Sequence, residues 1–583
     1  MGMRVTEMVV LGTLLWCRAA ADVIADVKAA DERVDATVAA IATPDELAAR
    51  QTDWRRKWLD MMGGMPAVKT PLAAQVTGVI PCDGYRVEKV LFQSLPGVYV
   101  TGLLYLPDSP KYAPPYPGLL VVHGHSQAGK MRDGYRRMAI LAAQAGFGVF
   151  APDPISQGER RQGRPPHDRD CALEHASIGA RGWLVGWNFA RFRIWDCVRA
   201  IDYMETRPEL DLSRLGVCGN SGGGTMSAYI QAFDDRIKVA APNCYVSSIR
   251  EVFRERGAHD AEQFFFGQLR DGFNHAALVA LGQPRVDLLI GARHADYFPI
   301  AGVRTTYALA RNLHDRLGFS NRLAMYSCDG PHGWAESSRQ AALAWMKFCV
   351  KGETTAYCDL RDGTFFFDVE ALRKIPGDFT FGTDKLPFPP ERGNVTATGQ
   401  VRDLQGFKSL YALIADEATR LSAVRRPLAE KGAYREIVRR RAGIRPLAEL
   451  RGQTLETDYR HQFDWWYLGG REGVRAENHT AMLSTLGRSR VGVKAEDMIQ
   501  RADRAVAANG GSPVPLKAKG ADCIAAAHAY AAEPQLFSGV ELVDPPPSWT
   551  EMCRMDDPRK DSYSIAVWGA LQEYDWTDLV RRP

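Results

Sequence analysis

Apolar residues recur along this chain in short continuous runs, each followed by a polar or glycine-rich turn and then by a stretch of helical periodicity. The runs predict strands at residues 87–92, 98–106, 117–122, 147–151, 214–218, 237–241, 286–290 and 323–327. Helical patterns follow at residues 134–145, 188–206, 222–233, 301–317 and 335–349. Alternating strands and helices specify a mostly parallel sheet with helices on both faces. The predicted fold class is therefore α/β.

The pattern divides the chain into five predicted regions. Residues 1–21 resemble an export signal, with Arg4 near the start, an apolar core and small residues at 19–21. Residues 22–75 form an amphipathic helical segment, and residues 76–350 the catalytic domain. Glycine and proline accumulate in a linker at 351–393, and residues 394–583 form a smaller second unit.

The second unit repeats a pattern of the first. A helix at 494–508, a strand at 514–517 and a small-residue helix at 524–532 parallel the order of elements around residues 189–233. In this register Gly520 stands where the first unit has Ser221. The pattern favours a degenerate, non-catalytic α/β unit packed against the first. An unrelated α/β cap remains the alternative.

Residues 219–223 read Gly-Asn-Ser-Gly-Gly, directly after a predicted strand and before a predicted helix. A Gly-x-Ser-x-Gly turn in that setting holds its serine in a strained conformation above the sheet edge, where it acts as a nucleophile. Similar clusters also occur as ordinary turns. The setting between strand and helix makes Ser221 the candidate nucleophile.

An acid and a base follow the serine in the order typical of serine hydrolases. Asp296 follows the strand at 286–290, and His332 follows the strand at 323–327. Each alone is an ordinary loop residue, but both lie after strands, at the edge where such sheets place their sites. Asp287 lies inside its strand and Asp329 only three residues before the histidine, so Asp296 is the preferred acid.

The strand at 117–122 ends in His123-Gly124-His125-Ser126. Such hydrolases place one oxyanion donor after this strand and the other at the residue after the nucleophile. We assign the donors to the backbone N–H groups of His125 and Gly222, with Ser126 as the alternative to His125. His123 and His125 share one face of the chain, but no third ligand follows at a suitable spacing. No metal and no cofactor are therefore expected.

Composition is that of an ordinary globular protein, with 46% hydrophobic residues and a net charge of +4 over 583 residues. No basic stripe or charged tail occurs, so neither nucleic acid nor a membrane is expected as a partner. The N-terminal pattern predicts an exported protein, periplasmic or secreted; if residues 1–21 form a buried helix instead, the protein is cytoplasmic. The eleven cysteines show no paired spacing and are expected to be mostly free, buried thiols.

Residues 50–350 resemble the bacterial acetylxylan-esterase-like α/β-hydrolase family, relatives of dienelactone hydrolases and prolyl oligopeptidases. The resemblance lies in the Gly-Asn-Ser-Gly-Gly-Gly turn and in residues 84–90, 95–101, 260–263, 296–299 and 331–333. It extends less fully to residues 396–401 and 569–579. Gly222 and Gly223 after the serine, and Gly333 after the histidine, depart from the cephalosporin-deacetylase pattern. The Arg and Lys that follow the serine in glucuronoyl esterases are also absent.

The resemblance implies the α/β-hydrolase fold and a serine esterase that removes short acyl groups, acetyl first, from carbohydrate esters. The expected partner is thus a small-molecule or polysaccharide ester; no oligomeric state follows from the sequence. Candidate substrate contacts are Trp183, Trp187, Trp334 and Glu262, although each tryptophan could equally be a core residue. Two alternatives remain. One is a prolyl-oligopeptidase-like peptidase, although the residues before the first strands are too few to form the β-propeller that such peptidases normally carry. The other is a non-catalytic binding protein derived from a hydrolase.

Overall fold

The computed structural model describes residues 23–163, 170–255, 260–361, 364–375, 386–451, 480–555 and 563–580. The predicted export signal lies outside these residues. A helix at 23–39 and helix α2 (Pro44–Met62) form the predicted N-terminal helical segment. None of the described helices is both long enough and apolar enough to span a bilayer. All ten cysteines in the described part of the chain are free, and most are buried, as predicted.

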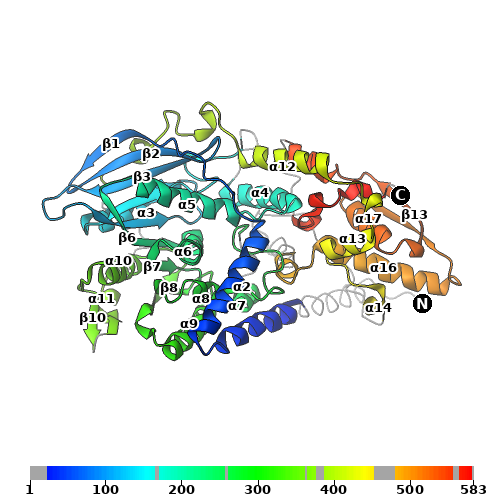
Figure 1. Ribbon diagram of the computed structural model, residues 1–583, viewed down its shortest axis with the longest axis horizontal. Coiled ribbons are helices and arrows are strands. Elements are labelled where there is room, and N and C mark those ends of the chain that lie inside the picture. The colour runs from blue at the N-terminus through cyan, green and yellow to red at the C-terminus, as the bar shows by residue number, and fades with distance from the viewer. Residues whose placement is uncertain are drawn as a thin grey trace, which may run out of the picture.

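The described residues contain a nine-stranded sheet in the order β1-β2-β3-β5-β4-β6-β7-β8-β9 (Figure 1). Its strands are β1 (Gln75–Cys82), β2 (Tyr85–Leu95), β3 (Val98–Pro107), β4 (Tyr116–Val122), β5 (Gly148–Pro152), β6 (Leu210–Asn220), β7 (Ile237–Asn243), β8 (Asp287–Ala295) and β9 (Leu323–Pro331). The run from β5 to β9 is parallel, and β1, β2, β3 and β5 pair antiparallel. The predicted α/β class is confirmed. The sequence pattern missed β1, a largely exposed edge strand without a continuous apolar run.

Helices cover both faces of this sheet. One face packs against α3 (Asp133–Gln144) and α10 (Glu336–Lys351). The other packs against α2, α5 (Ala190–Glu205), α6 (Gly222–Phe233), α8 (His275–Leu281) and α9 (Ile300–Leu317). The sequence pattern missed α4 (Cys171–Val185), α7 (Ile249–Glu255) and α8. Burial of α4 around most of its circumference leaves no amphipathic period to detect.

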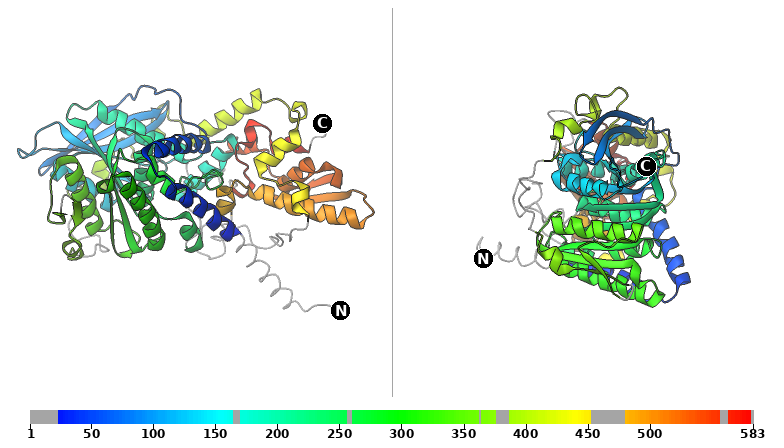
Figure 2. Two further views of the ribbon diagram at one scale, coloured as in Figure 1. Left: turned by 60° about the horizontal axis from the view of Figure 1, so that its bottom comes forward. Right: turned by 90° about the vertical axis from the view of Figure 1, so that its left-hand side faces the viewer.

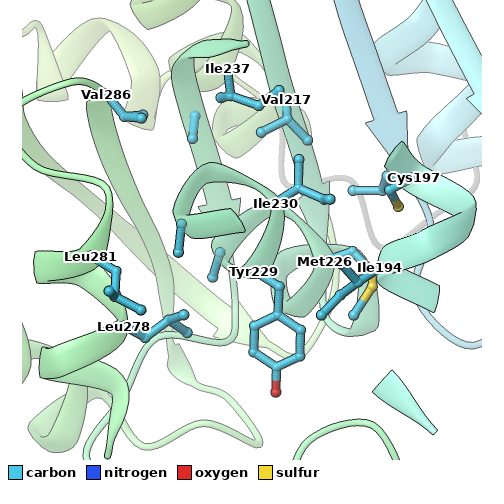
Figure 3. Close-up of a cluster of buried hydrophobic side chains, with 14 of the residues drawn as sticks. Ile194, Cys197, Val217, Met226, Tyr229, Ile230, Ile237, Leu278, Leu281 and Val286 are labelled. Atoms are coloured by element: carbon cyan, nitrogen blue, oxygen red, sulfur yellow. The ribbon is translucent and has the colours of Figure 1, made fainter. Parts of the chain in front are cut away.

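Helix α6 lies at the centre of the second face (Figure 3). Its Met226, Tyr229 and Ile230 pack among buried side chains of α5, α8 and the sheet. Glycines at its start allow this close approach. A Cβ at Gly223 would stand 2.2 Å from the Val122 carbonyl oxygen, and one at Gly224 would stand 2.3 Å from that of Asn243. The start of α6 is thereby pressed against the ends of β4 and β7.

The described residues of 410–580, which we call the C-terminal region, lie beside the sheet, toward the right of Figure 1. Their main elements are α12 (Leu410–Val424), α13 (Tyr434–Ala442), α14 (Leu447–Leu450), α16 (Arg490–Ala508), β12 (Val514–Lys519), α17 (Asp522–Ala532), β13 (Phe537–Val543) and α18 (Trp549–Arg554). Strands β12 and β13 form a separate parallel pair. The predicted helix, strand and helix at 494–532 correspond to α16, β12 and α17.

One hydrophobic core contains side chains of the C-terminal region, of α4, and of the loops at residue 155 and residues 261–269. The Trp183 ring of α4 lies 4.7 Å from that of Tyr563 and 5.8 Å from that of Trp568, between ring centroids. The Trp183 carbonyl oxygen also accepts a hydrogen bond from the Gly569 N–H at 2.7 Å. The left-hand view of Figure 2 shows the two parts side by side along the long axis of the molecule.

The predicted linker contains the hairpin of β10 (Cys358–Arg361) and β11 (Thr364–Phe367), followed by α11 (Val369–Arg373). Beyond it, residues 394–408 run back over the loop that follows β5. The buried Glu159 carboxylate of that loop accepts hydrogen bonds from the N–H groups of Val395 and Thr396, each at 2.8 Å. These hydrogen bonds attach residues 394–408 to the loop after β5, ahead of the C-terminal region.

Candidate active site

Ser221 stands at the turn between β6 and α6 with φ 60° and ψ −125°. A serine rarely adopts a positive φ, and the surrounding contacts hold this strained geometry. Its N–H donates to the Asn243 carbonyl oxygen at 3.0 Å, and its carbonyl oxygen accepts the Thr225 N–H at 2.8 Å. A Cβ at Gly219 would stand 2.3 Å from the Val122 carbonyl oxygen. The turn thus has the backbone of a nucleophile elbow.

Asp296 and His332 follow the neighbouring parallel strands β8 and β9. The His332 Nδ1–H donates to Asp296 Oδ1 at 2.9 Å, and the Phe298 N–H donates to the same oxygen at 2.8 Å. Burial raises the pKa of the Asp296 carboxyl, but the contact with His332 outweighs burial and the pKa is lowered. Because an ionised carboxylate only accepts, Nδ1 carries the proton and the outer His332 nitrogen is left to accept one.

The two rival acids lie elsewhere. Asp287 stands at the opposite end of β8, where it pairs with Arg322 at 3.2 Å. Asp329 is exposed and pairs with His294 at 2.6 Å. Of the acids predicted from the sequence, Asp296 is the one that meets His332.

Cys244, which follows β7, lies between the serine turn and the acid–base pair. The donor atoms of Cys244, Asp296 and His332 all lie within 4.8 Å of one another. Burial and the nearby Asp296 raise the pKa of the Cys244 thiol far above its ordinary value, so the thiol stays protonated. Since Asn243 receives the Ser221 N–H, residues 243 and 244 connect the serine turn to the acid.

The His-Gly turn after β4 lies against the serine turn. The Gly124 N–H is engaged by the Tyr135 hydroxyl at 2.7 Å, and the Ser126 N–H by Gln157 Oε1 at 2.6 Å. The His125 N–H between them makes no hydrogen bond within the described part of the chain, so it can donate to an oxyanion. The Gly222 N–H belongs to the first turn of α6, whose amides have no partners within the helix. A Cβ at Gly222 would stand 3.3 Å from the Gly124 Cα, so the two candidate oxyanion donors are near neighbours.

Tyr135 of α3 was not anticipated from the sequence. Its hydroxyl accepts the Gly124 N–H and donates to the Asn220 carbonyl oxygen at 2.9 Å. One buried side chain thereby fixes both turns that carry the candidate site. A tyrosine in the first turn of a helix carries no sequence signal for this role.

Beside the serine turn, four side chains from distant parts of the chain form a compact group that we call the His–carboxylate cluster: His125, His175, Asp260 and Glu262. Their donor atoms lie within 4.8 Å of one another. Burial lowers the pKa values of both histidines, but Asp260 and Glu262 outweigh it and raise them to about 10 for His125 and about 8 for His175. Glu262, predicted as a substrate contact, is 0% exposed and pairs with Arg193.

The predicted aromatic contacts are mainly packing residues in this conformation. Trp183 is 1% exposed, within the core shared with the C-terminal region. Trp334 is 8% exposed, and its ring lies 5.2 Å from that of Tyr135. Trp187 is half-buried beneath the Arg191 guanidinium, 4.5 Å from the ring centroid.

The loop after β5 is braced by buried charges. Lys130 Nζ lies 2.6 Å from Asp153 Oδ2 and 2.5 Å from Glu159 Oε1. Arg160 pairs with Asp196 at 2.7 Å. All five charged groups are nearly or fully buried. Asp153 and Arg160 therefore support the loop from within.

Comparison with known proteins agrees with this architecture. Residues 23–251 match the model of a family described as the Abhydrolase family. A putative hydrolase of Bacillus subtilis (strain 168), YtaP, is 28% identical over 160 residues, which cover 27% of this chain and 50% of the relative. The matched region thus spans half the length of that curated protein.

Among solved structures, Methylesterase BT1017 superposes with a TM-score of 0.50 at 17% identity, covering 68% of this chain and 81% of its own. A putative acetyl xylan esterase from Bacteroides fragilis covers 50% of this chain and 77% of its own, with 18% identity and a TM-score of 0.41. The family match and the first superposition confirm the predicted α/β-hydrolase fold.

Proposed function

Because residues 23–251 match the abhydrolase family and the sheet has the α/β-hydrolase arrangement, we propose that this protein is a serine esterase. The observation that carries the proposal is the Asp296–His332 hydrogen bond after β8 and β9, at the same edge of the parallel sheet as the strained Ser221 turn after β6. A serine hydroxyl is a weak nucleophile without an adjacent base, and the base needs a partner to fix its tautomer. In the proposal Ser221, His332 and Asp296 take these three roles.

In the proposed reaction His332 takes the Ser221 proton as the serine oxygen attacks the ester carbonyl. The carbonyl oxygen becomes an oxyanion, which the Gly222 and His125 N–H groups stabilise. Each such donor contributes about 2.7–4 kcal/mol of transition-state stabilisation. His332 then passes the proton to the departing alcohol, which leaves an acyl-serine. Water attacks this intermediate by the same route, releases the acid and restores the serine.

We further propose that the substrate is a short acyl ester of a carbohydrate, acetyl first. Support comes from the sequence resemblance to acetylxylan-esterase-like hydrolases. The likeness to a methylesterase makes methyl esters the second class to test. Neither likeness names the sugar.

The test compares the wild-type protein with Ser221→Ala on p-nitrophenyl acetate, acetylated xylan and a methyl-esterified polysaccharide. A fluorophosphonate probe should label the wild type and not the variant, because labelling needs an activated serine. Loss of turnover of at least about 10³-fold is expected in the variant. Equal turnover by both proteins would reject the mechanism. Cleavage of Xaa-Pro anilides in place of esters would favour a peptidase, and a folded, unlabelled wild type a binding protein.

A further inference from the structure

We propose that the His–carboxylate cluster beside the serine turn is a binding site for a divalent transition-metal ion, with Zn²⁺ as the best fit. The four ligands would be His125 Nε2, His175 Nδ1, Asp260 and Glu262. The proposal goes beyond ester hydrolysis and does not depend on it.

The spacing of the donor atoms carries the proposal. His125 Nε2 lies 3.2 Å from His175 Nδ1, 3.0 Å from Asp260 Oδ2 and 3.4 Å from Glu262 Oε1. His175 Nδ1 lies 3.0 Å from Asp260 Oδ1 and 3.6 Å from Glu262 Oε2. Zinc binds histidine nitrogen and carboxylate oxygen at about 2.0–2.2 Å in a tetrahedron, whose edges are then about 3.3–3.6 Å. The separations involve both oxygens of each carboxylate, so they are not the edges of a single tetrahedron, but they bring a carboxylate oxygen of each acid to each ring nitrogen at or slightly below that edge length. One donor atom from each of the four residues lies within 4.8 Å of the others.

The hydrogen bonds of His175 direct one of its ring nitrogens into the cluster. His175 Nε2 lies 3.0 Å from the Ile155 carbonyl oxygen, which only accepts, so Nε2 carries a proton. In the neutral ring, Nδ1 then has a lone pair, and it faces three other donor atoms of the cluster. A metal ion satisfies a lone pair and two carboxylates together. A ring nitrogen that binds metal while the other donates to a backbone carbonyl is the usual arrangement at zinc sites.

Glu262 gives a second, independent indication. Its side chain is 0% exposed, and its Oε2 has no hydrogen-bond partner in the described structure. Its other oxygen pairs with Arg193, which also donates to the His123 carbonyl oxygen at 2.9 Å. Two carboxylates against one guanidinium require at least one further positive charge in this largely buried site, and either a protonated histidine or a metal ion can supply it. A divalent ion supplies that charge.

The cluster lies beside the turn that carries a proposed oxyanion donor, so a bound ion would act on that turn. The His125 Cε1 atom lies 3.2 Å from where a Cβ at Gly222 would stand. An ion on the His125 ring would therefore hold the turn whose N–H faces the proposed oxyanion. The loop bearing Asp260 is joined to α6 as well, since Gln263 Nε2 donates to Thr225 Oγ1 at 2.7 Å. Imidazole ligands favour Zn²⁺ and its neighbours over Mg²⁺ or Ca²⁺.

The experiment uses the full chain without a histidine tag, because a tag would bind zinc itself. The protein is stripped with a chelator, dialysed against 1 molar equivalent of ZnCl₂ and then against metal-free buffer, and its metals are measured by inductively coupled plasma mass spectrometry. About one zinc per chain and a rise in Tm on adding Zn²⁺, but not Mg²⁺, are expected. Retention below about 0.1 equivalent with an unchanged Tm would overturn the proposal. It would assign the cluster to a protonated hydrogen-bond network.

Two variants make the assignment specific. Asp260→Asn keeps the side-chain shape and removes one ligand charge, so zinc affinity should fall at least about tenfold. Asp271→Asn is the matched control, because Asp271 pairs with Arg270 on the surface near the same loop and lies outside the cluster. Should Asp260→Asn misfold, His175→Phe, which keeps the ring contact with Phe189, serves in its place. Unchanged zinc affinity in a folded variant would also reject the site.

Discussion

Gly520 holds in the C-terminal region the backbone position that Ser221 holds in the main sheet. Both residues have φ 60° and follow a strand that leads into a buried helix. The Ser221 N–H donates to the last residue of β7 at 3.0 Å, and the Gly520 N–H donates to the last residue of β13 at 2.9 Å. The residues that follow β7 and β13 are Cys244 and Asp544, and both also have positive φ. We propose from this correspondence that the C-terminal region is a degenerate relative of the main fold, without the nucleophile.

Replacing Asp296 tests the orientation of the base. Asp296→Asn removes the carboxylate that keeps the proton on His332 Nδ1, so kcat on an activated ester should fall about 10³–10⁴-fold. Steady-state kinetics at pH 7 checks this. Asp287→Asn, at the far end of the same strand, is the control and should stay within about twofold. Equal losses in both variants would contradict the assignment of the acid.

A single methyl group tests the serine turn. Gly223→Ala would bring a Cβ to 2.2 Å from the Val122 carbonyl oxygen, so the backbone must shift and displace Ser221. Activity should fall at least about 10²-fold, since misplacement by about 1 Å has that cost. At Gly134, near the start of α3, the nearest atom would be 3.7 Å from the new Cβ. Gly134→Ala should therefore leave activity intact, and a fully active Gly223→Ala protein would contradict the close packing.

The buried charges around Lys130 predict a large loss of stability on substitution. Lys130→Met leaves Asp153 and Glu159 buried without their cation, which costs about 3–5 kcal/mol. Urea unfolding at pH 7 measures this free energy. Lys28→Met is the matched control, because Lys28 and Glu32 form an exposed pair with side chains 61% and 46% accessible. Exposed pairs contribute about 0–1 kcal/mol, so similar losses would contradict a buried network.

Trp183 predicts that the C-terminal region depends on α4 for its attachment. Trp183→Ala removes a fully buried ring that contacts Tyr563 and Trp568, and should cost about 3–5 kcal/mol. Limited proteolysis should then cut residues 410–580 faster than in the wild type. Trp187→Ala removes a half-buried ring and should have the smaller effect. Unaltered proteolysis of the Trp183 variant would indicate an independently stable C-terminal region.

Buried histidines predict a loss of stability in mild acid. Burial lowers the pKa of His528 to about 4, whereas an unfolded histidine titrates near 6.5. Below pH 6.5 the unfolded chain therefore binds a proton at His528, whereas the folded chain binds one there only near pH 4. The stabilisation that comes from this pKa difference is fully present above pH 6.5. As the pH falls below 6.5, the free energy of unfolding decreases by up to about 1.4 kcal/mol per pH unit.

His528→Gln should flatten this decline by about one proton, since glutamine does not titrate in the range. Urea unfolding at intervals from pH 8 to pH 4 measures both slopes. Other buried histidines, such as His275, also have a lowered pKa, so some slope remains in the variant. Parallel curves for the two proteins would contradict a neutral His528.

The sequence alone determined the alternation of strands and helices, and with it the parallel sheet. Buried parallel strands read as continuous apolar runs, and the order of serine, acid and base follows where these strands end. Asp296 could be preferred over Asp287 by its place after the strand, and the structure brings Asp296 to His332. The edge strand β1 and the mostly buried helix α4 were not predicted, because β1 has no continuous apolar run and α4 has no amphipathic period.

Only the tertiary structure decided which distant side chains meet. His125 and His175 are 50 residues apart, and Asp260 lies 85 residues beyond His175, so no local spacing could indicate their cluster. The same holds for Tyr135, which joins two turns from a third element. Crossover connections in a parallel sheet bring remote strand ends to one edge. Side chains that act together there are set by strand order, which local sequence patterns do not encode.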